Sequence, residues 1–200
     1  MKEKIRIGCG AGFSGDRLEP ALILTEQGNL DYLVLECLAE RTIALAQKRK
    51  KENPELGYDV LLERRIEGLL PLLLKHHTRL ITNMGAANPI AGAKKIIEIA
   101  QKKGLKVKVA VVLGDDIFSQ LTGEELTLEG NKPLHSYGTL ISANAYLGID
   151  ALLPALESDA QIILTGRVAD PSLFLAPMVH ELGWDTKDSQ LLGQGTVLGH

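Results

Sequence analysis

Short apolar runs alternate with longer segments of helical periodicity along most of this chain of 200 residues. Strands that alternate with helices are typical of a parallel sheet, because two parallel strands need a long crossover connection, which is usually a helix. We therefore predict an α/β fold with an open, mainly parallel sheet flanked by helices. The apolar runs that predict strands cover residues 4–7, 32–35, 79–83, 107–113 and 161–164.

The regular alternation fails between Thr122 and Gly138. Within this stretch, residues 124–136 predict a small hairpin that projects from the domain as an insertion. Residues 139–146 are expected to form a further strand, and the chain becomes polar after Trp184. Residues 193–200 have neither a helix stop nor a charged tail, so we expect the chain to end inside an element. We treat residues 1–200 as a single Rossmann-like α/β domain.

Charge and hydropathy argue against two classes of partner. A net charge of −3 disfavours a nucleic-acid surface, because binding phosphates requires clustered cations. The longest apolar stretches, such as residues 69–74, are too short to span a bilayer. Residues 1–4 lead directly into a predicted strand and show no signal peptide. With only two cysteines and no disulfide framework, we expect a cytoplasmic protein without nucleic-acid or membrane partners.

Several polar residues follow the predicted strands by only a few positions. In open α/β sheets, ligands bind outside the carboxyl ends of the strands, where the loops and the helix N-termini converge. These positions are therefore candidates for a functional site, although polar loop residues also cap helices or contact solvent. They are Asp16, Arg17, Glu36, Asn83, Asn88, Asp115, Asp116, Arg167 and Asp170.

The turn after the last predicted strand carries the strongest signal. Arg167 lies between a glycine turn and a helix start, where its charge favours an anionic ligand. Asp170 and Asn88 each precede a proline, which is typical of a helix N-cap followed by the first helical residue. Asn83 lies at a strand tip and is freer to contact a ligand.

The first glycine-rich segment offers an alternative function. Gly10, Gly12 and Gly15 match the G-x-G-x-x-G pattern, and Glu36 follows at the spacing of an acid that binds the ribose of NAD or FAD. This pattern predicts a dinucleotide-dependent oxidoreductase. Asp16 and Pro20 depart from the pattern, because they delay the helix that should open inside the glycine run.

A metal site is a weaker possibility in this sequence. Asp115 and Asp116 are paired carboxylates that suit Mg²⁺ or acid/base chemistry, but adjacent acids in a turn more often cap a helix beside solvent. The two cysteines and five histidines are scattered, which is unlike the ligand spacing of a zinc site. We predict no metal and assign no cofactor.

Seven motifs, in order along nearly the whole chain, resemble those of the acyclic terpene utilisation family. They cover residues 8–17, 33–42, 82–89, 142–148, 165–170, 180–184 and 195–200. The resemblance implies a part in the breakdown of citronellol- and geraniol-type terpenes, a route through branched acyl-CoA thioesters, but assigns no role to a single residue. Family members are longer, so the chain is expected to be the N-terminal part of a longer domain.

Together these patterns favour an enzyme of unassigned reaction class that binds an anionic acyl substrate, such as a CoA thioester or a carboxylate. An assembly or regulatory subunit without catalytic activity remains an alternative, and a homo-oligomer is left open. We predict that Asp16, Glu36, Asp115 and Asp116 are catalytic. We predict that the substrate contacts are Gly12, Ser14, Arg17, Asn83, Asn88, Asn144, Arg167 and Asp170.

Overall fold

A computed structural model describes residues 2–200 of the chain. The strands are β1 (Ile7–Ala11), β2 (Tyr32–Leu35), β3 (Arg79–Thr82), β4 (Val109–Val112) and β5 (Ile162–Thr165). The α-helices are α1 (Glu19–Gln27), α2 (Glu40–Glu52), α3 (Leu62–His76), α4 (Pro89–Lys102), α5 (Ile149–Glu157), α6 (Ser172–Leu182) and α7 (Ser189–Gly199). Two short 3-10 turns cover Phe118–Gln120 and Leu134–Tyr137.

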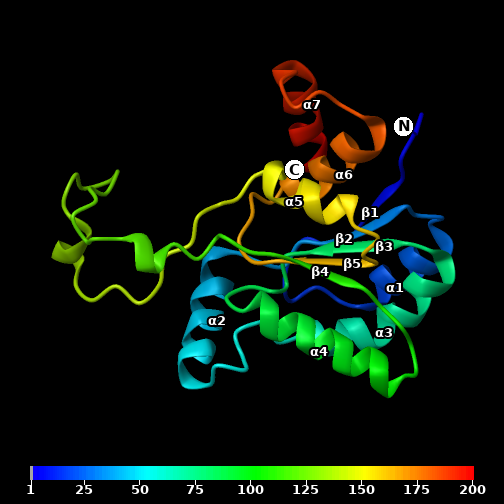
Figure 1. The fold of residues 1–200 in the computed structure, drawn as a ribbon, viewed down its shortest axis with the longest axis horizontal. Coiled ribbons are helices and arrows are strands. Elements are labelled where there is room, and N and C mark those ends of the chain that lie inside the picture. Colours follow the sequence, from blue (N-terminus) through cyan, green and yellow to red (C-terminus); the bar gives the residue numbers. More distant parts are fainter. Residues whose placement is uncertain (1) are drawn as a thin grey trace.

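The five strands form one open sheet in the order β1-β2-β3-β5-β4, and every neighbouring pair is parallel. The predicted α/β fold with an open parallel sheet is therefore confirmed (Figure 1). The chain runs in one direction from β1 to β4 and then turns back to place β5 between β3 and β4. Because βαβ crossovers are right-handed, this reversal moves the following helices to the other face of the sheet.

Two hydrophobic layers follow from that topology. Helices α1, α3 and α4 pack on one face of the sheet, against residues such as Leu33, Leu80 and Leu164. Helices α5 and α6 pack on the opposite face, against Val34 and Ile163. The central strands β2, β3 and β5 are buried on both faces, which explains why they appear in the sequence as continuous apolar runs.

The two helical layers determine where the loops at the carboxyl ends of the strands diverge. The loop after β3 leads to α4 on one face, whereas the loop after the neighbouring strand β5 leads to α6 on the other face. Such a divergence between adjacent strands opens a crevice at their carboxyl ends, and ligands bind there in open α/β sheets. The fold therefore places its topological switch point between β3 and β5.

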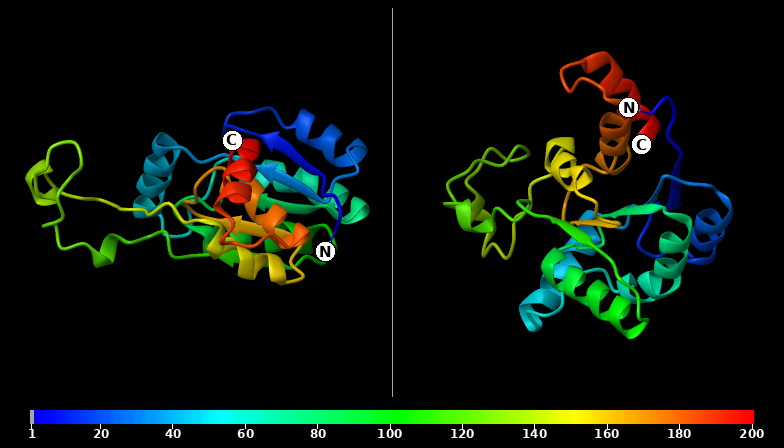
Figure 2. Two further views of the ribbon diagram at one scale, coloured as in Figure 1. Left: turned by 90° about the horizontal axis from the view of Figure 1, so that it is seen from above. Right: turned by 45° about the vertical axis from the view of Figure 1, so that its right-hand side comes forward.

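Residues 117–143 form a projecting arm, which stands away from the rest of the molecule (Figures 1 and 2). The predicted hairpin within it is reduced to one antiparallel bridge, between Leu126 and Pro133. The predicted strand over residues 139–146 is wrong, because this segment returns along the arm without a neighbouring strand to pair with and forms only an isolated bridge at Asn144.

Two further predictions at the ends of the domain need correction. The first strand is shifted from residues 4–7 to Ile7–Ala11, so that Gly8 and Gly10 belong to the strand rather than to the following turn. The polar segment after Trp184 contains helix α7, which begins at Ser189 and packs against α6. Within residues 2–200, no helix combines the length and the apolar character needed to cross a membrane.

Candidate functional site

A cavity of about 400 Å³, here called the acidic cavity, lies at the carboxyl ends of β1, β2 and β5. Two carboxylates contribute to its wall, Glu36 from the end of β2 and Asp170 from the loop after β5. The residues that line the acidic cavity are Cys9, Gly12, Glu36, Asp170, Phe174, Leu198, Gly199 and His200. The cavity thus gathers three predicted site residues, Gly12, Glu36 and Asp170, from three separate loops.

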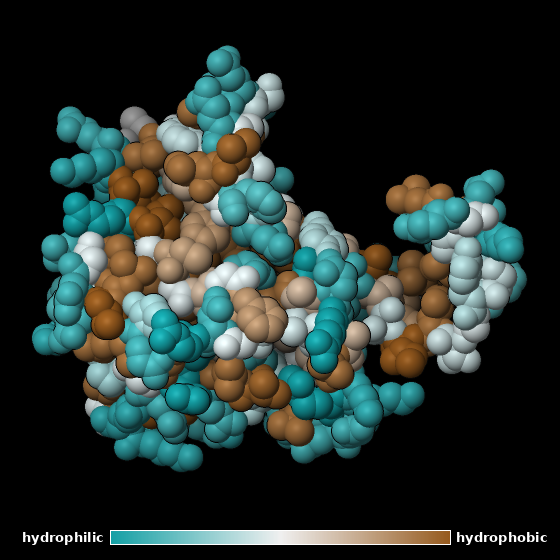
Figure 3. Space-filling model, turned by 180° about the vertical axis from the view of Figure 1, so that it is seen from behind, coloured by the Kyte–Doolittle hydropathy of each residue, from teal (hydrophilic) through white to brown (hydrophobic). Residues whose placement is uncertain are grey.

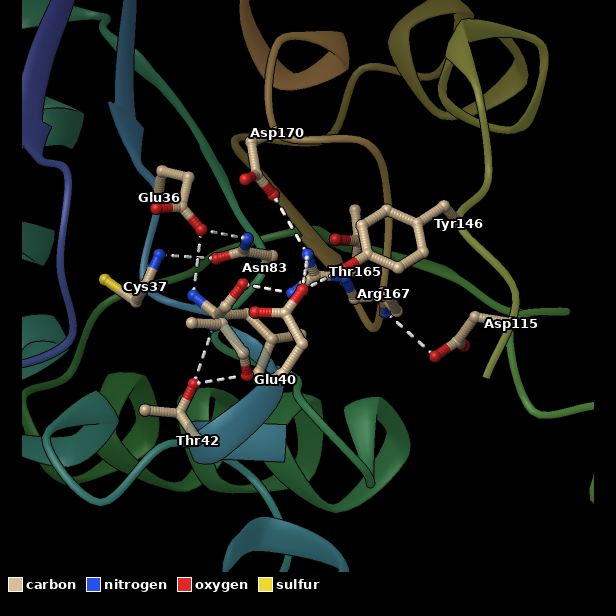
Figure 4. Close-up of polar contacts among 12 residues, drawn as sticks. Glu36, Cys37, Glu40, Thr42, Asn83, Asp115, Tyr146, Thr165, Arg167 and Asp170 are labelled. Carbon is tan, nitrogen blue, oxygen red and sulfur yellow. Dashed lines mark hydrogen bonds and ion pairs between the residues drawn. The ribbon is translucent and has the colours of Figure 1, made fainter. Parts of the chain in front are cut away.

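Glu36 is held in a fixed orientation by the neighbouring strand. Its Oε1 accepts hydrogen bonds from Asn83 Nδ2 at 2.8 Å and from the Leu38 amide at 2.9 Å. Asn83 is fully buried, and its Oδ1 accepts a 2.7 Å hydrogen bond from the Cys37 amide (Figure 4). The Asn83 amide therefore bridges β3 to the end of β2 and orients the Glu36 carboxylate.

The Glu36 carboxyl is half-buried, and this burial raises its pKa above the ordinary value of 4.5. The hydrogen bonds from Asn83 and Leu38 act in the opposite direction, as does the charge of Arg167. Asp170 adds a like charge that raises the pKa of Glu36 further. A carboxyl with a raised pKa beside a cavity is a candidate for accepting and returning a proton.

A buried arginine supports this site from behind. The Arg65 guanidinium of α3 is 2% exposed and donates to the Ser14 and Asp16 carbonyls at 2.9 and 3.0 Å. Its Nη1 lies 2.6 Å from Cys37 Sγ, and burial nevertheless raises the pKa of this thiol to about 12. Arg65 thereby fixes the loop after β1 against the end of β2.

Ser14 has an inward-facing position in the same network. Its side chain is buried, and its Oγ donates a 2.6 Å hydrogen bond to Asp59 Oδ2. The other oxygen of Asp59 accepts a hydrogen bond from the Leu61 amide at 2.8 Å, which satisfies an amide at the start of α3. Ser14 therefore connects the loop after β1 to α3 and does not line the acidic cavity.

Arg167 is the best-connected residue at the carboxyl edge of the sheet. It is 3% exposed, its Nη1 donates to the Leu38 carbonyl, and its Nη2 lies 3.5 Å from both Glu40 and Asp170 carboxylates. The guanidinium also stacks on the Tyr146 ring, with 3.9 Å from Cζ to the ring centroid. Arg167 Nε is buried without a hydrogen-bond partner among residues 2–200, so this donor is unsatisfied within the described chain.

Asp170 does not have the capping role that its position before Pro171 suggested. Helix α6 has Pro171 at its N-cap position, and no side chain caps it. The Asp170 carboxylate turns instead toward Arg167, with a buried Oδ1 that accepts no hydrogen bond among residues 2–200 (Figure 4). The Asp170 side chain is nevertheless 44% exposed and lines the acidic cavity, so it can contact a ligand there.

A second cavity of about 280 Å³, here called the tyrosine cavity, lies on the other side of the Arg167–Asp170 ion pair. Asp170 lines the acidic cavity and Arg167 lines the tyrosine cavity, so the pair separates the two. The residues that line the tyrosine cavity are Glu40, Ile43, Ala44, Ser142, Ala143, Asn144, Tyr146 and Arg167.

Asp115 joins the loops that surround the tyrosine cavity. Its buried carboxylate accepts hydrogen bonds from the Arg167 amide at 2.8 Å and from Asn144 Nδ2 at 2.9 Å. A Cβ on Gly166 would lie 2.6 Å from both Asp115 oxygens, so this contact requires glycine. Asp115 is occupied as a connector, whereas the adjacent Asp116 is exposed and pairs with Lys50 at 3.7 Å.

Like Ser14, Asn83, Asp115 and Asp116, three further predicted site residues line neither the acidic nor the tyrosine cavity. Asp16 is exposed, and its carboxylate accepts a hydrogen bond from the Gly12 amide at 2.9 Å, which closes the loop after β1. Arg17 is exposed and makes no side-chain hydrogen bond or ion pair within residues 2–200. Asn88 caps α4 through the Ala91 amide, as predicted, and also donates to two loop carbonyls.

The glycine loop does not adopt the arrangement that dinucleotide binding requires. Gly10 lies within β1, where a Cβ would contact Leu35 and Ala21 at 2.8 and 3.0 Å. Helix α1 begins only at Glu19, well after the last glycine of the pattern. Gly10 therefore permits close packing of α1 on β1, whereas a Cβ on Gly12 would meet no atom within 4 Å. Strand β1 is also an edge strand rather than a neighbour of the switch point.

No group of three or more His, Cys, Asp or Glu side chains within residues 2–200 is arranged to hold a metal ion. A third cavity of about 490 Å³, here called the apolar cavity, adjoins the acidic cavity and shares Cys9, Phe174 and Leu198 with it. Its remaining residues are Glu3, Lys4, Ile5, Ile7, Met178, Leu182 and Trp184. An acidic chamber thus adjoins a mainly apolar one.

Sequence reasoning missed Arg65, Glu40 and Tyr146 as parts of this region. Arg65 carried a readable signal, because it falls on the apolar stripe of α3 between Leu62 and Leu69 at helical spacing. Glu40 and Tyr146 carried none, since the hydrogen bond between them joins positions 106 residues apart.

Comparison with known protein families gives one match. A family model described as acyclic terpene utilisation family protein AtuA matches residues 5–200, which confirms the resemblance seen in the motifs. Searches of curated proteins and of solved structures returned no match.

Proposed function

Because the chain belongs to the acyclic terpene utilisation family AtuA, we propose that it acts as an enzyme in the breakdown of acyclic terpenes or branched acyl compounds. In this proposal, an anionic acyl substrate binds at the carboxyl edge of the parallel sheet. The reacting group enters the acidic cavity, and Glu36 transfers a proton to or from it.

One observation carries the proposal, namely the half-buried Glu36 carboxyl with its raised pKa and its fixed orientation beside a cavity. General acid/base catalysis requires a group whose pKa lies near the working pH and whose position is held by its surroundings. Asn83 supplies the positioning, because its amide nitrogen bonds the same carboxylate oxygen that the Leu38 amide does. The second oxygen of Glu36 is left for the substrate.

Arg167 is our candidate for the negatively charged part of the substrate. Its Nε has no partner within residues 2–200, and the guanidinium lines the tyrosine cavity. Glu40 is exposed, so an incoming carboxylate or phosphate can displace it from Arg167 Nη2 without burying its charge. Arg167 suits this role because a planar guanidinium binds carboxylates and phosphates through several donors.

The apolar cavity supports an acyl substrate with a branched hydrocarbon tail. Phe174 and Leu198 lie on the wall that it shares with the acidic cavity, so a tail placed there leaves its head group beside Glu36 and Asp170. Burial of each methylene group contributes about 0.8 kcal/mol to binding. A substrate that fills both chambers is therefore favoured over a short acid.

The test measures binding and proton transfer separately. Isothermal titration with a branched acyl-CoA and with the matching free acid measures affinity, and mass spectrometry in D₂O measures deuterium uptake beside the carbonyl. We expect Glu36→Gln to bind the ligand with unchanged affinity and to lose about 10²- to 10⁴-fold in exchange rate. Asp116→Asn is the matched control, because this carboxylate is exposed and lines neither the acidic nor the tyrosine cavity.

Absence of heat with both ligands contradicts the proposed binding site and favours a subunit without catalytic activity. Equal exchange rates for the wild-type chain and Glu36→Gln contradict the assignment of Glu36 even where binding is retained. Equal losses for Glu36→Gln and Asp116→Asn contradict it as well, since a specific proton carrier cannot be replaced by a remote carboxylate.

A further inference from the structure

The projecting arm, residues 117–143, has a defined shape but no core of its own. The Thr127 amide donates to the Lys132 carbonyl, and the Leu134 amide donates to the Glu125 carbonyl, both at 2.9 Å. The Glu125 carboxylate accepts hydrogen bonds from the Thr122 and Gly123 amides, which lowers its pKa to about 2. These contacts are all local to the arm, and no residue of the arm is buried.

The arm exposes large apolar side chains to solvent. Leu128 is 98% exposed, and hydrophobic side chains are visible on the surface of the arm where it stands off from the body (Figure 3). Exposed apolar groups of this kind, on a segment that its own chain leaves uncovered, mark an interaction surface. The other large apolar side chains that the arm exposes are those of Phe118, Leu126, Tyr137 and Ile141.

The charge of the arm is also one-sided. It carries three carboxylates, Glu124, Glu125 and Glu129, and Lys132 is the only Lys or Arg in residues 117–143. A surface that fits the arm must therefore offer apolar contact together with positive charge.

The exposed side of α2 has this composition. Arg41, Lys48 and Lys51 flank Ala44 and Leu45 along one stripe at helical spacing, and all five residues are exposed. We refer to these five residues as the α2 stripe. In the α2 stripe, two apolar residues lie among three cationic ones. This composition complements the acidic and apolar arm.

Only the base of the arm approaches the α2 stripe of its own chain, since Ser142 and Ala143 line the tyrosine cavity together with Ala44. Helix α2 is joined to the residues that flank the arm, by the Lys50–Asp116 ion pair at 3.7 Å, by the Gln47–Asn144 hydrogen bond at 3.1 Å and by the hydrogen bond from Tyr146 to Glu40. From this base the arm extends away from the body (Figures 1 and 2). The arm and α2 both leave the carboxyl edge of the sheet, after β4 and β2 respectively.

From this arrangement we infer that the arm docks on the α2 stripe of a second copy of this chain, forming a two-fold dimer in which two arms are exchanged. Because arm and stripe lie on the same side of the molecule, a two-fold axis on that side presents each arm to the other stripe. Such an interface is isologous and closed, so assembly stops at the dimer. This inference does not depend on the proposed function.

Sedimentation velocity of the full chain, up to about 100 µM, tests the inference. The wild-type chain is expected to be a dimer, and Leu128→Asp on the arm or Lys48→Glu on the stripe is expected to weaken dimerisation at least about tenfold. Val197→Asp is the matched control, since Val197 is 78% exposed on α7, outside both surfaces. All these side chains are exposed, so none of the substitutions disturbs a core.

A charge-reversal pair distinguishes this interface from other modes of association. Glu129→Lys and Lys48→Glu chains are each expected to be monomeric, and a mixture of the two is expected to form a heterodimer. In the mixed dimer, one contact is charge-reversed on both sides and the other contact is unchanged. A monomeric wild-type chain, a dimer that resists Leu128→Asp, or a mixture that stays monomeric overturns the inference.

Discussion

Gly166 occupies a position at which the structure leaves no room for a side chain. A Cβ there would push the Asp115 carboxylate away from the Arg167 amide and from Asn144. We expect Gly166→Ala to lower the free energy of unfolding by about 2–3 kcal/mol, because a buried amide would lose its partner. Urea unfolding followed by circular dichroism measures the loss.

Gly193→Ala is the control for this substitution. A Cβ on Gly193, within α7, meets no atom within 4 Å, so alanine is expected to stabilise the helix by about 0.5–1 kcal/mol. A loss at position 166 no larger than the change at position 193 would show that the contact with Asp115 contributes nothing to stability.

The raised pKa of Glu36 predicts a dependence of stability on pH. The folded chain binds this proton more tightly than the unfolded chain, so the free energy of unfolding falls as pH rises from the ordinary value of 4.5 through the raised pKa. Glu36→Gln keeps the acceptor for Asn83 and Leu38 but has no charge to bury. We expect this variant to have a higher melting temperature at pH 7 and a flatter stability profile across that range.

A melting temperature for Glu36→Gln that stays below that of the wild type at pH 7 would contradict the raised pKa. Asp116→Asn again serves as the comparison, because that carboxylate is exposed. Measuring both the melting temperature and the deuterium exchange rate of Glu36→Gln separates its effect on stability from its effect on catalysis.

At the residue scale, the sequence predicted where the site residues lie better than it predicted what each of them does. Glu36, Asn83 and Arg167 were expected at one edge of a parallel sheet, and they meet there because each follows a strand by one or two residues. The capping role of Asp170 could not be decided from its place before proline. That choice depends on Arg167, whose charge attracts the carboxylate more strongly than the start of α6 does.

Helix α4 illustrates how one side chain anchors an element. Asn88 Oδ1 accepts from the Ala91 amide at 3.3 Å, while its Nδ2 donates to the Pro54 and Leu56 carbonyls at 2.8 Å each. The residue therefore caps α4 and also fastens the loop between α2 and α3. We expect Asn88→Ala to destabilise the chain by about 1–2 kcal/mol in urea unfolding.

Asn88→Asp separates these two roles. Aspartate keeps the capping oxygen and favours the helix N-terminus, but it removes both donors to the loop carbonyls. An Asn88→Asp chain as stable as the wild type would show that the cap alone matters. A loss close to that of Asn88→Ala would assign the stability to the loop contacts instead.

At the element scale, predictions failed where a pattern depended on its surroundings. A glycine-rich strand has no clear periodicity, and β1 is defined by pairing with β2 rather than by its own residues. Residues 139–146 have a strand-like composition but no free strand beside them. Helix α7 contains several glycines and forms because Gly195 packs closely against Trp184 and Leu175.

The whole molecule depends on two arginines at opposite ends of the sheet. Arg167 joins three segments at the carboxyl edge, through the Leu38 carbonyl and Glu40 after β2, Tyr146 before α5, and Asp170 in its own loop after β5. Arg79, at the start of β3, donates to carbonyls at the end of α5 and after it, including those of Leu156, Ser158 and Ala160. No local pattern predicts either network, because the partners come together only when strand β5 inserts between β3 and β4.

Because the two arginines lie at opposite ends of the sheet, their variants allow an effect on stability to be separated from an effect on ligand binding. We expect Arg167→Met to lower the free energy of unfolding by about 1–3 kcal/mol, because the Leu38 carbonyl would lose its donor, whereas the Asp170 and Glu40 carboxylates are partly or largely exposed and lose only a weak partner. Arg79→Met is expected to cost a comparable amount, since it leaves several carbonyls without a donor. Urea unfolding measures both values.

Only the Arg167 variant is expected to lose affinity for a branched acyl-CoA, because Arg79 lies at the amino ends of the strands, far along the sheet from the acidic and tyrosine cavities. Arg167→Lys should retain part of the binding, since it keeps the charge but not the planar group that stacks on Tyr146. Titrations without urea, at a temperature at which all three variants are folded, make this comparison. Equal affinities for Arg167→Met and Arg79→Met would leave Arg167 with a structural role alone and would move the anion site elsewhere.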